Sequence, residues 1–289
     1  MTGTDADDAP PLVDAAWLQT VGERVAEAEG LLLCLDFDGT LAPIVDDPDD
    51  ATLPRETRQR LRQLANAPDV TVAVVSGREL SDLRERVDLE DIHYAGNHGM
   101  ELGDGDEARI PDAVAEHQPA VRSVVDRLRE SLADVPGCRV EDKHLTATVH
   151  LRGVPDDRQA EVAATVRDTA ASVDGVHTSE GKAIVEVRPD VDLGKGWVVE
   201  RLRDAHPDHV PLFVGDDVTD EDGFRAVSDR DGGVLVGSRP DTDATVRVPG
   251  PETVTLLLGW LVEAATESFA STPVGLDDAP LTPESGTYD

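Results

Sequence analysis

The sequence predicts an α/β protein in which a mainly parallel, Rossmann-like sheet carries helices on both faces, with a separate α+β domain inserted into it. Three observations predict this fold. Short, continuously apolar segments suit strands that are buried on both faces, and they alternate with segments of helical periodicity. Polar residues follow several of these strands directly, as they do at the carboxyl edge of parallel sheets. In the middle of the chain the alternation gives way to a helix–hairpin pattern.

The first part of the chain alternates helix and strand from residue 13 onward. Apolar spacing predicts, in order, helix 13–28, strand 31–35, helix 54–65, strand 70–75, helix 81–87 and strand 92–95. The same rhythm returns near the end as helix 194–204, strand 211–214, helix 220–227, strand 233–236 and helix 251–264. Such βαβα order implies right-handed crossovers in one mainly parallel sheet.

The middle of the chain follows a different pattern. We expect a long helix over 111–132, strands at 139–142 and 145–152, a helix over 156–172, and a hairpin of 175–179 with 183–188. This unit interrupts the larger domain, so we predict an inserted domain at 111–189 within a core formed by 13–110 and 190–267. The acidic ends, 1–12 and 268–289, are expected to be disordered tails.

The composition is strongly acidic. Of the 289 residues, 60 are Asp or Glu and 26 are Lys or Arg, which gives a formal net charge of −34. Self-repulsion of this size is screened by salt, and the composition resembles that of proteins from cells that keep molar salt inside. It disfavours non-specific binding to nucleic acid, which depends on basic surface.

Several other classes of protein are also disfavoured. No apolar run approaches the roughly 18–20 residues that a membrane helix needs, and the opening MTGTDADDAP lacks the apolar region of a secretory signal. The two cysteines, Cys34 and Cys138, form neither a disulfide framework nor a metal-binding spacing. We therefore expect a cytoplasmic protein.

Reactive side chains follow three of the predicted strands. LLLCLDFDGTL places Asp36 at the end of an apolar run, with Asp38 and Thr40 in the turn that follows. VAVVSGR presents Ser76, and LFVGDDVTDED presents Asp216, Asp217 and Asp220. Lys195 stands near a helix start in DLGKGW.

These residues suit phosphoryl transfer. Carboxylates that converge from separate strand ends, such as Asp36 and Asp216, are hard oxygen ligands that favour Mg²⁺. A carboxylate also serves as a nucleophile, and Asp38 could act as general acid and base. Mg²⁺, Lys195 and the Ser76 hydroxyl would neutralise the phosphoryl charge. In so acidic a chain a solvated acidic face explains Asp216–Asp222 about as well, until the preceding apolar strand is considered.

The ordered set DFDGT, SGR, a lysine and GDDVTDED resembles the four motifs of the haloacid-dehalogenase-like phosphatases across roughly residues 30–240. The resemblance implies that Asp36 is the nucleophile, Asp38 the general acid/base, and Ser76 and Lys195 the phosphoryl-binding groups, with Thr40 supporting the loop. It also implies an Mg²⁺ site made by Asp36, the Asp38 carbonyl and Asp216, with Asp217 and Asp220 further out or acting through water. The insertion occupies the position of that family's larger cap domain.

Further strings resemble trehalose-6-phosphate phosphatases: DFDGTLAPIVDDPDDA, GNHGMEL, VEDKHLTATVHLR and GKAIVEVRP. This resemblance implies that the cap residues Glu141, Lys143, Lys182 and Glu186 reach the sugar hydroxyls. It places His98 near the junction of cap and core, and it completes the substrate-binding set with Gly77, Arg78 and Asn97. The role of Arg78 stays open, as does that of Arg188, which could contact phosphate or end the hairpin.

The lysines give independent support. The chain has only three, Lys143, Lys182 and Lys195, and all three fall within these motifs. Retention of lysine at these positions alone fits a need for a compact ammonium, which the planar guanidinium of arginine does not replace.

The expected activity is Mg²⁺-dependent hydrolysis of trehalose 6-phosphate, a step of trehalose biosynthesis. One alternative is a related phosphatase that acts on sucrose phosphate, mannosyl-3-phosphoglycerate or glucosylglycerol phosphate. Another is a catalytically silent regulatory subunit of a trehalose-phosphate synthase, which the filled catalytic positions disfavour. Functional pairing with such a synthase is also expected for an active enzyme.

Overall fold

The computed structural model describes residues 9–45, 47–104, 107–181 and 183–266. The chain divides into two units: a core unit, Met1–Glu107 with Leu193–Asp289, and an inserted unit, Ala108–Asp192. The inserted unit thus begins at Ala108 rather than at Pro111 and ends at Asp192 rather than at Pro189. Most of the predicted disordered tails, residues 1–8 and 268–289, lies outside the described residues.

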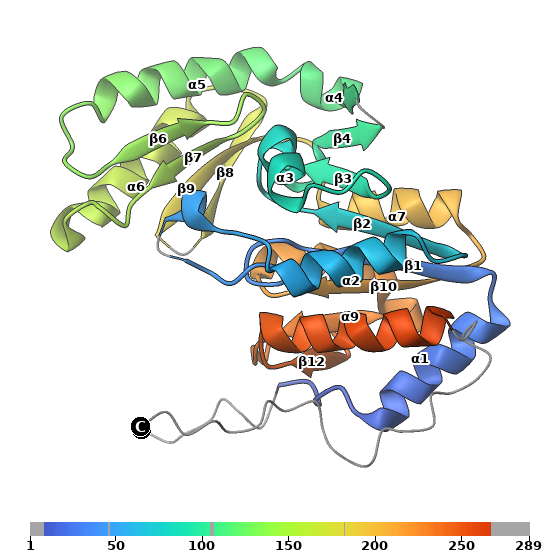
Figure 1. Ribbon diagram of the computed structural model, residues 1–289. Helices are drawn as coiled ribbons and strands as arrows, with labels where there is room; N and C mark the ends of the chain where they lie inside the picture. Colours follow the sequence, from blue (N-terminus) through green and yellow to red (C-terminus); the bar gives the residue numbers. More distant parts are fainter. Residues whose placement is uncertain (1–8, 46, 105–106, 182, 267–289) are drawn as a thin grey trace, which may run out of the picture. The chain divides into compact units, whose positions relative to one another are not determined.

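The described strands of the core form one twisted sheet (Figure 1). Its spatial order is β12-β11-β10-β1-β2-β3-β4-β5. The bounds are β1 Gly30–Leu35, β2 Val70–Val75, β3 His93–Gly96, β4 Glu101–Asp104, β5 Glu107–Arg109, β10 His209–Gly215, β11 Gly233–Val236 and β12 Val246–Val248. The pairs from β12 to β3 are parallel and β3 with β4 is antiparallel, which confirms a mainly parallel sheet.

Helices cover both faces of this sheet because the central strands are apolar on both sides. In β1, Leu31, Leu33 and Leu35 belong to one buried cluster while Leu32 and Cys34 belong to another, as alternation along a strand requires. The first cluster includes residues of α1 Ala15–Glu27, α2 Arg55–Ala65, α3 Leu80–Val87 and α9 Pro251–Thr266. The second includes residues of α7 Lys195–Ala205 and α8 Glu221–Val227.

Short 3₁₀ turns connect several of these elements. They are η1 Pro48–Asp50, η2 Asn97–Gly99, η3 Val218–Asp220 and η4 Ser228–Arg230. Two of them follow strand ends directly, η2 after β3 and η3 shortly after β10. Polar residues in η2 and η3 are therefore carried at the carboxyl edge of the sheet, where ligands bind in such folds.

The inserted unit is an antiparallel sheet covered on one face by two helices. The sheet order is β6-β7-β9-β8. The elements are α4 Asp112–Ala115, α5 Gln118–Ser131, β6 Arg139–Asp142, β7 Ala147–His150, α6 Asp156–Ala171, β8 Val176–Gly181 and β9 Ile184–Pro189. Valines of α5 and α6 pack with Val149, Val185 and Val187 of the strands, so one face of the sheet is apolar and the other is left for polar residues.

The structure departs from the sequence expectations in three places. The helix predicted over 111–132 is two helices, α4 and α5, because Pro119 lies in the first turn of α5, where its missing N–H costs nothing. Strands β4, β5 and β12 were not anticipated. Residues 10–12, assigned to a tail, instead run beside β12: the carbonyls of Pro10 and Pro11 accept hydrogen bonds from Arg247.

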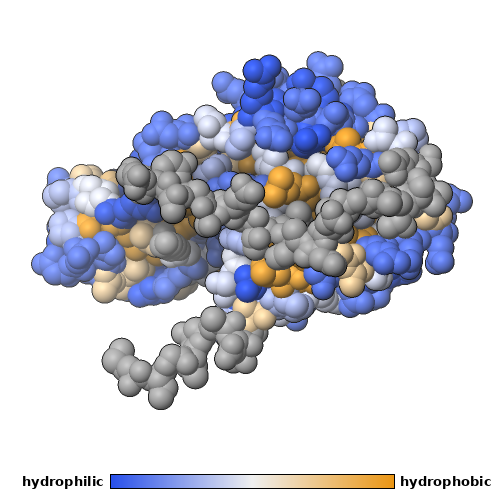
Figure 2. All heavy atoms as spheres, turned by 60° about the horizontal axis from the view of Figure 1, so that its bottom comes forward, coloured by the Kyte–Doolittle hydropathy of each residue, from blue (hydrophilic) through white to orange (hydrophobic). Residues whose placement is uncertain are grey.

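On the face shown in Figure 2 hydrophilic residues line the upper part, and hydrophobic residues gather around the middle of the view. Among the described residues, three large apolar side chains are exposed: Ile44, Val218 and Leu256. No helix in the described part of the chain combines the length and the apolarity needed to cross a membrane.

Candidate active site

Asp36 and Asp216 meet at the carboxyl edge of the core sheet. Strands β1 and β10 are parallel neighbours, with Leu35 paired to Val214, and each aspartate follows its strand directly. The Asp36 N–H donates to the Val214 carbonyl at 2.9 Å, which extends the pairing up to the first aspartate. The sequence prediction that these two strand ends converge is therefore confirmed.

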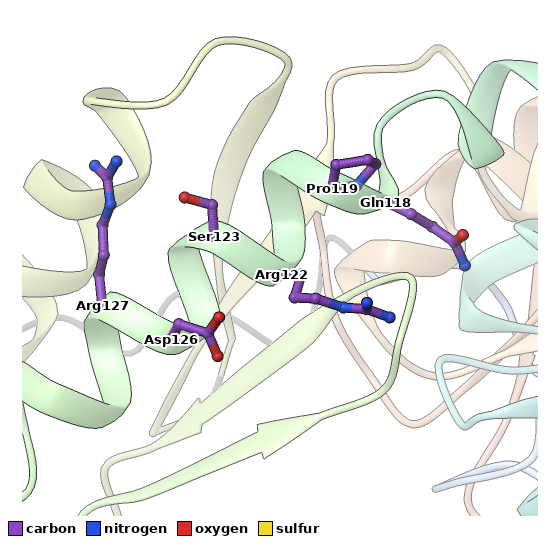
Figure 3. Close-up of a pocket in the computed structure, with 6 residues that line it drawn as sticks. All are labelled: Gln118, Pro119, Arg122, Ser123, Asp126 and Arg127. Carbon is purple, nitrogen blue, oxygen red and sulfur yellow. The ribbon is translucent and has the colours of Figure 1, made fainter.

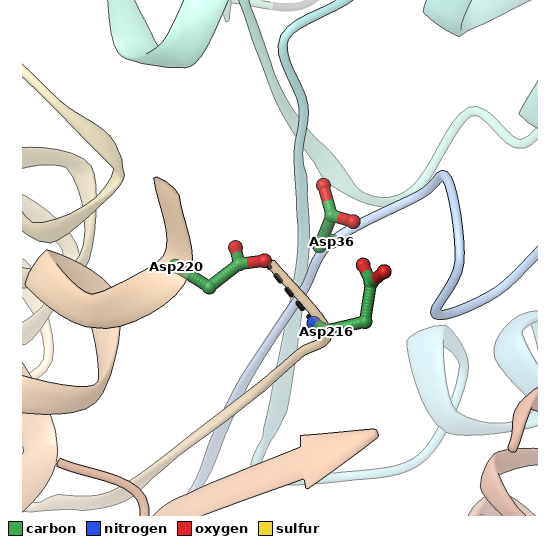
Figure 4. Close-up of side chains that lie close together, drawn as sticks. All are labelled: Asp36, Asp216 and Asp220. Carbon is green, nitrogen blue, oxygen red and sulfur yellow. Dashed lines mark hydrogen bonds between the residues drawn. The ribbon is translucent and has the colours of Figure 1, made fainter. Parts of the chain in front are cut away.

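A third carboxylate joins them from η3. Asp36, Asp216 and Asp220 each offer an oxygen atom, and these atoms lie within 4.8 Å of one another (Figure 4). Asp220 is fully buried, and its Oδ2 accepts the backbone N–H groups of Asp216 at 3.1 Å and of Asp217 at 3.0 Å. The Asp217 side chain is directed differently: it is exposed and accepts the N–H of Val218.

Lys195 neutralises part of this cluster. It is the first residue of α7 and is only 3% exposed. Its Nζ donates to Asp36 Oδ1 at 2.7 Å and to Asp220 Oδ1 at 2.6 Å. Burial lowers the pKa of Lys195, but the two carboxylates outweigh burial and hold the pKa above its ordinary value. The side chain is therefore a fixed cation between two carboxyl groups.

The three carboxyl groups of the cluster crowd one another. Burial raises the pKa of Asp36 well above its usual range, and Asp216 and Asp220 add to this while Lys195 opposes it. Burial, with the charge of Asp220, raises the pKa of Asp216 to about 7. One ammonium thus faces three crowded carboxylates, and an additional cation would relieve their repulsion.

The donor set suits a small divalent cation. Both oxygens of Asp220 are already engaged, by Lys195 and by two backbone N–H groups, so Asp36 and Asp216 are left as the direct carboxylate ligands. Carboxylate and carbonyl oxygens are the ligands that Mg²⁺ prefers. The residues present therefore fit such an ion, with Asp220 orienting the loop that carries Asp216.

The turn after β1 depends on a glycine. Gly39 has φ +84, and a Cβ built on it would lie 2.2 Å from Asp216 Oδ2, so only glycine allows this approach. The buried Thr40 places its hydroxyl 3.5 Å from Asp216 Oδ1. Asp38 lies in the same turn with its side chain 42% exposed, so it is much more accessible from solvent than Asp36, whose side chain is 6% exposed.

The SGR segment after β2 is also at this edge. Ser76 is buried, and its Oγ accepts the N–H of Arg78 at 3.2 Å. Gly77 packs so closely on His98 that an added Cβ would lie 2.6 Å from two ring atoms. The Arg78 guanidinium binds the Asp38 carboxylate with two hydrogen bonds of 2.7 Å. This ion pair links two of the sequence motifs and was not foreseen.

The strand end after β3 carries Asn97 and His98, both buried and both in the left-handed region, with φ of 47° and 58°. Asn97 Nδ2 donates to Glu101 Oε2 at 3.1 Å. The same carboxylate oxygen accepts the N–H of Leu80 at 2.8 Å. Glu101 thus ties this strand end to the start of α3, a role that was not predicted although Glu101 lies within the GNHGMEL motif.

Two of the four predicted sugar-binding residues of the inserted unit, Glu141 and Glu186, lie on its polar face. Glu141 is paired across the strands with Thr148, and Thr148 with Glu186, so these side chains share the face opposite to the helices. Glu141 Oε2 lies 2.6 Å from His150 Nε2, and this contact lowers the pKa of Glu141 against the effect of burial. Lys143 follows β6, and Lys182 lies outside the described residues.

Two further groupings lie away from the motif residues. A hollow of about 470 Å³ runs along α5 and is lined by Gln118, Pro119, Arg122, Ser123, Asp126 and Arg127 (Figure 3). The rings of His206 and His209 lie 4.9 Å apart, with His93 6.5 Å from His206, near the amino ends of β10 and β3. The sequence had given these histidines no shared position.

Comparison with known proteins places the chain among trehalose phosphatases. A family model described as trehalose-phosphatase matches residues 34–251. The trehalose-phosphate phosphatase of Mycobacterium marinum is 41% identical over 214 residues, which are 72% of this chain and 54% of that protein. That of Mycolicibacterium paratuberculosis is 41% identical over 224 residues, 75% of this chain and 56% of that protein. The chain thus spans about half the length of these relatives.

Solved structures give the same result. The C-terminal domain of trehalose-6-phosphate phosphatase from C. albicans superposes with a TM-score of 0.74 at 26% identity, covering 89% of this chain and 99% of that one. The trehalose-6-phosphate phosphatase of Aspergillus fumigatus has a TM-score of 0.62 at 28% identity, covering 88% of this chain and 99% of that one. These likenesses support the predicted fold class of a mainly parallel core sheet with an inserted α+β unit.

Proposed function

This chain belongs to the trehalose-phosphatase family, and we propose that it is an Mg²⁺-dependent phosphatase that hydrolyses trehalose 6-phosphate to trehalose and phosphate. One observation carries the proposal: a buried strand-end carboxylate, Asp36, is held by Lys195 beside two further carboxylates in a chain of this family. Trehalose-phosphate phosphatases of several mycobacteria are 40–41% identical to this chain over aligned stretches of 214 to 224 residues.

The proposed reaction uses Asp36 as the nucleophile. Its free carboxylate oxygen attacks phosphorus, the bond from phosphorus to the sugar oxygen breaks, and Asp38 gives that oxygen its proton. Water then attacks the aspartyl phosphate and passes a proton to Asp38, and the bond from phosphorus to Asp36 breaks. Lys195 and the Ser76 hydroxyl would balance the charge of the phosphoryl oxygens.

Mg²⁺ would be held by Asp36, the Asp38 carbonyl and Asp216, and it would supply positive charge that draws the substrate phosphoryl group toward the buried carboxylates. In this proposal Asp220 orients the Asp216 loop through its hydrogen bonds. Asp217 is exposed, so its part would be through water. Thr40 would support the turn, since its hydroxyl is near Asp216.

Sugar recognition is assigned to the polar face of the inserted unit. Hydroxyl-rich ligands need paired charged and polar groups, and Glu141 and Glu186 present carboxylates on one face of the sheet. We propose that these residues contact the sugar hydroxyls together with Lys143 and Lys182. From the core, Gly77, Asn97 and His98 would shape the site around the phosphate-bearing end, since they pack at the edge that carries Ser76.

The cellular setting follows from the proposed activity and is likewise a proposal. We propose that the reaction takes place in the cytoplasm, because an anionic sugar phosphate does not cross a membrane unaided. Supply of that substrate suggests functional pairing with a trehalose-phosphate synthase.

The experiment is phosphate release from trehalose 6-phosphate in high potassium chloride with Mg²⁺. Wild type is compared with Asp36→Asn and with a matched control, Asp50→Asn, an exposed carboxylate of η1. Sucrose 6-phosphate, mannosyl-3-phosphoglycerate, glucosylglycerol phosphate, glucose 6-phosphate and p-nitrophenyl phosphate are run alongside.

We expect selective release from trehalose 6-phosphate that is lost, by at least about a thousandfold, in Asp36→Asn alone. Preference for another sugar phosphate would keep the mechanism and replace the substrate. Absence of release from any ester, in protein shown to be folded, would refute the enzyme proposal in favour of a regulatory subunit.

A further inference from the structure

The N–H groups of the Arg78 guanidinium are used almost entirely by hydrogen bonds within the core unit, which leaves little capacity to bind a ligand. Nε donates to Asp38 Oδ2 at 2.7 Å, and Nη2 donates to Asp38 Oδ1 at 2.7 Å and to the Pro48 carbonyl at 2.8 Å. Nη1 donates to Asp82 Oδ2 at 2.9 Å. All but one of the N–H groups of the guanidinium are thus engaged.

The position of the guanidinium is fixed from several sides. Its side chain is 10% exposed, and its carbon lies 5.4 Å from the centroid of the Phe37 ring, which suits a cation–π contact. Asp82 holds it from α3 and Pro48 from η1. Burial lowers the pKa of Arg78, but hydrogen bonds with Asp38 outweigh this effect, so the group stays charged.

A planar fork that binds both oxygens also fixes the plane and the rotamer of the carboxylate. Asp38 is otherwise a half-exposed side chain in a turn, and no other side-chain hydrogen bond to it is described in the structure. Its orientation therefore depends on Arg78.

We infer that Arg78 is a positioning residue that sets the orientation of the Asp38 carboxylate for both of its proton transfers, and is not a sugar-binding residue. The inference rests on the proposed function, because it assigns Asp38 the part of general acid and base. It replaces the expectation, taken from the family resemblance, that Arg78 contacts substrate.

The chain contains a matched control in Arg86. This arginine lies on α3, whereas Arg78 precedes that helix. Its Nε donates to both oxygens of Asp82 at 2.8 Å, and its Nη1 donates to the carbonyls of Ala51 at 2.6 Å and Asp49 at 3.1 Å. It therefore ties α3 to the segment around η1 as Arg78 does. It makes no described contact with Asp38, so the two arginines separate tethering from positioning.

The test compares Arg78→Met, Arg78→Lys and Arg86→Met with wild type on two esters. Trehalose 6-phosphate has a poor leaving group that needs a proton, whereas p-nitrophenolate leaves without one. Misplacement of Asp38 should lower kcat on the sugar phosphate by about 10- to 100-fold with little change in KM. With p-nitrophenyl phosphate it should slow the water step only, which gives a burst of one nitrophenolate per enzyme.

Combination with Asp38→Asn identifies the residue through which Arg78 acts. We expect Arg78→Met with Asp38→Asn to be within about twofold of Asp38→Asn alone, because a residue that acts only through Asp38 adds nothing once Asp38 is changed. Arg78→Lys should lie between wild type and Arg78→Met, and it keeps the charge if Arg78→Met fails to fold. Arg86→Met should leave kcat within about twofold of wild type.

Three outcomes would overturn the inference while leaving the proposed function intact. A raised KM at constant kcat, without a burst, would make Arg78 a substrate contact. Parallel losses in Arg78→Met and Arg86→Met would make it a tether. Multiplicative losses in the double variant would separate it from Asp38. If wild type itself releases no phosphate from either ester, the proposed function falls, and the inference falls with it.

Discussion

Replacement of Asp216 by asparagine should stabilise the metal-free protein while it removes the response to Mg²⁺. Asp216 is one of three crowded carboxylates that share a single ammonium, and burial raises its pKa from 3.8 to about 7. An amide of the same shape keeps the acceptor near the Thr40 hydroxyl but removes a buried like charge. Carboxylates that are placed to bind a cation repel one another when the cation is absent, so a metal site of this kind is expected to lower the stability of the metal-free protein.

The size of the effect follows from that shift. A carboxyl whose pKa is higher in the folded than in the unfolded state keeps its proton longer when folded, so its contribution to stability falls as pH rises from about 4 to about 7. Above pH 7 the ionised Asp216 lowers the unfolding free energy by the full amount, about 4 kcal/mol. At pH 5 the loss is about a third of that amount. Asp216→Asn should therefore raise the unfolding free energy at pH 8 by an amount on the order of 2–4 kcal/mol, and by much less at pH 5.

Urea unfolding in EDTA at constant high salt measures this directly, with Asp204→Asn, an exposed carboxylate of α7, as the control. Addition of Mg²⁺ should raise the urea midpoint of wild type and of the control, because an ion that binds only the native state stabilises that state. The midpoint of Asp216→Asn should stay nearly unchanged, because this variant lacks one of the proposed Mg²⁺ ligands. A loss of stability in Asp216→Asn at pH 8, or an equal gain at both pH values, would refute the reasoning from like-charge crowding.

Further predictions concern Lys195, two glycines and Cys34 of the core unit. Lys195→Met leaves two buried carboxylates without their cation, so we expect a loss of about 3–5 kcal/mol at pH 8 that shrinks at lower pH, measured by urea unfolding. Gly77→Ala puts a Cβ 2.6 Å from the His98 ring and should cost about 1–3 kcal/mol in thermal unfolding, whereas Gly22→Ala, with its nearest neighbour at 3.7 Å, should be neutral or stabilising. Burial raises the pKa of Cys34 to about 12, so a thiol reagent should label it only after the protein unfolds.

The sheet and its strand-end aspartates could be predicted because each depends on local sequence. Leu31–Leu35 is apolar without interruption, which only a strand buried on both faces requires at that length, and Asp36 is the first polar residue after it. The same pattern before Asp216 gave β10. Parallel pairing then brought the two aspartates to one edge without any further information.

Features that depend on distant contacts could not be predicted in this way. Strand β12 has three residues, too few for a periodic pattern, and it exists because it pairs with β11. The fork between Arg78 and Asp38 joins residues that are far apart in the sequence and that no spacing rule relates. The break before α5 is different, because Pro119 is a visible signal for a helix start. The prediction of one helix over 111–132 followed the apolar periodicity of the segment and disregarded this proline.

The retention of lysine in this acidic chain can now be explained at one position by geometry. Lys195 is buried within the core, and its single nitrogen donates at 2.7 Å to Asp36, which follows β1, and at 2.6 Å to Asp220 of η3. A compact ammonium on a flexible stem can serve two oxygens from different directions in so small a space, whereas a guanidinium presents its donors in one plane. Arg78 shows the opposite case, since its fork matches both oxygens of one carboxylate. The chain therefore keeps lysine where one point charge must bridge two anions, and arginine where one anion must be oriented.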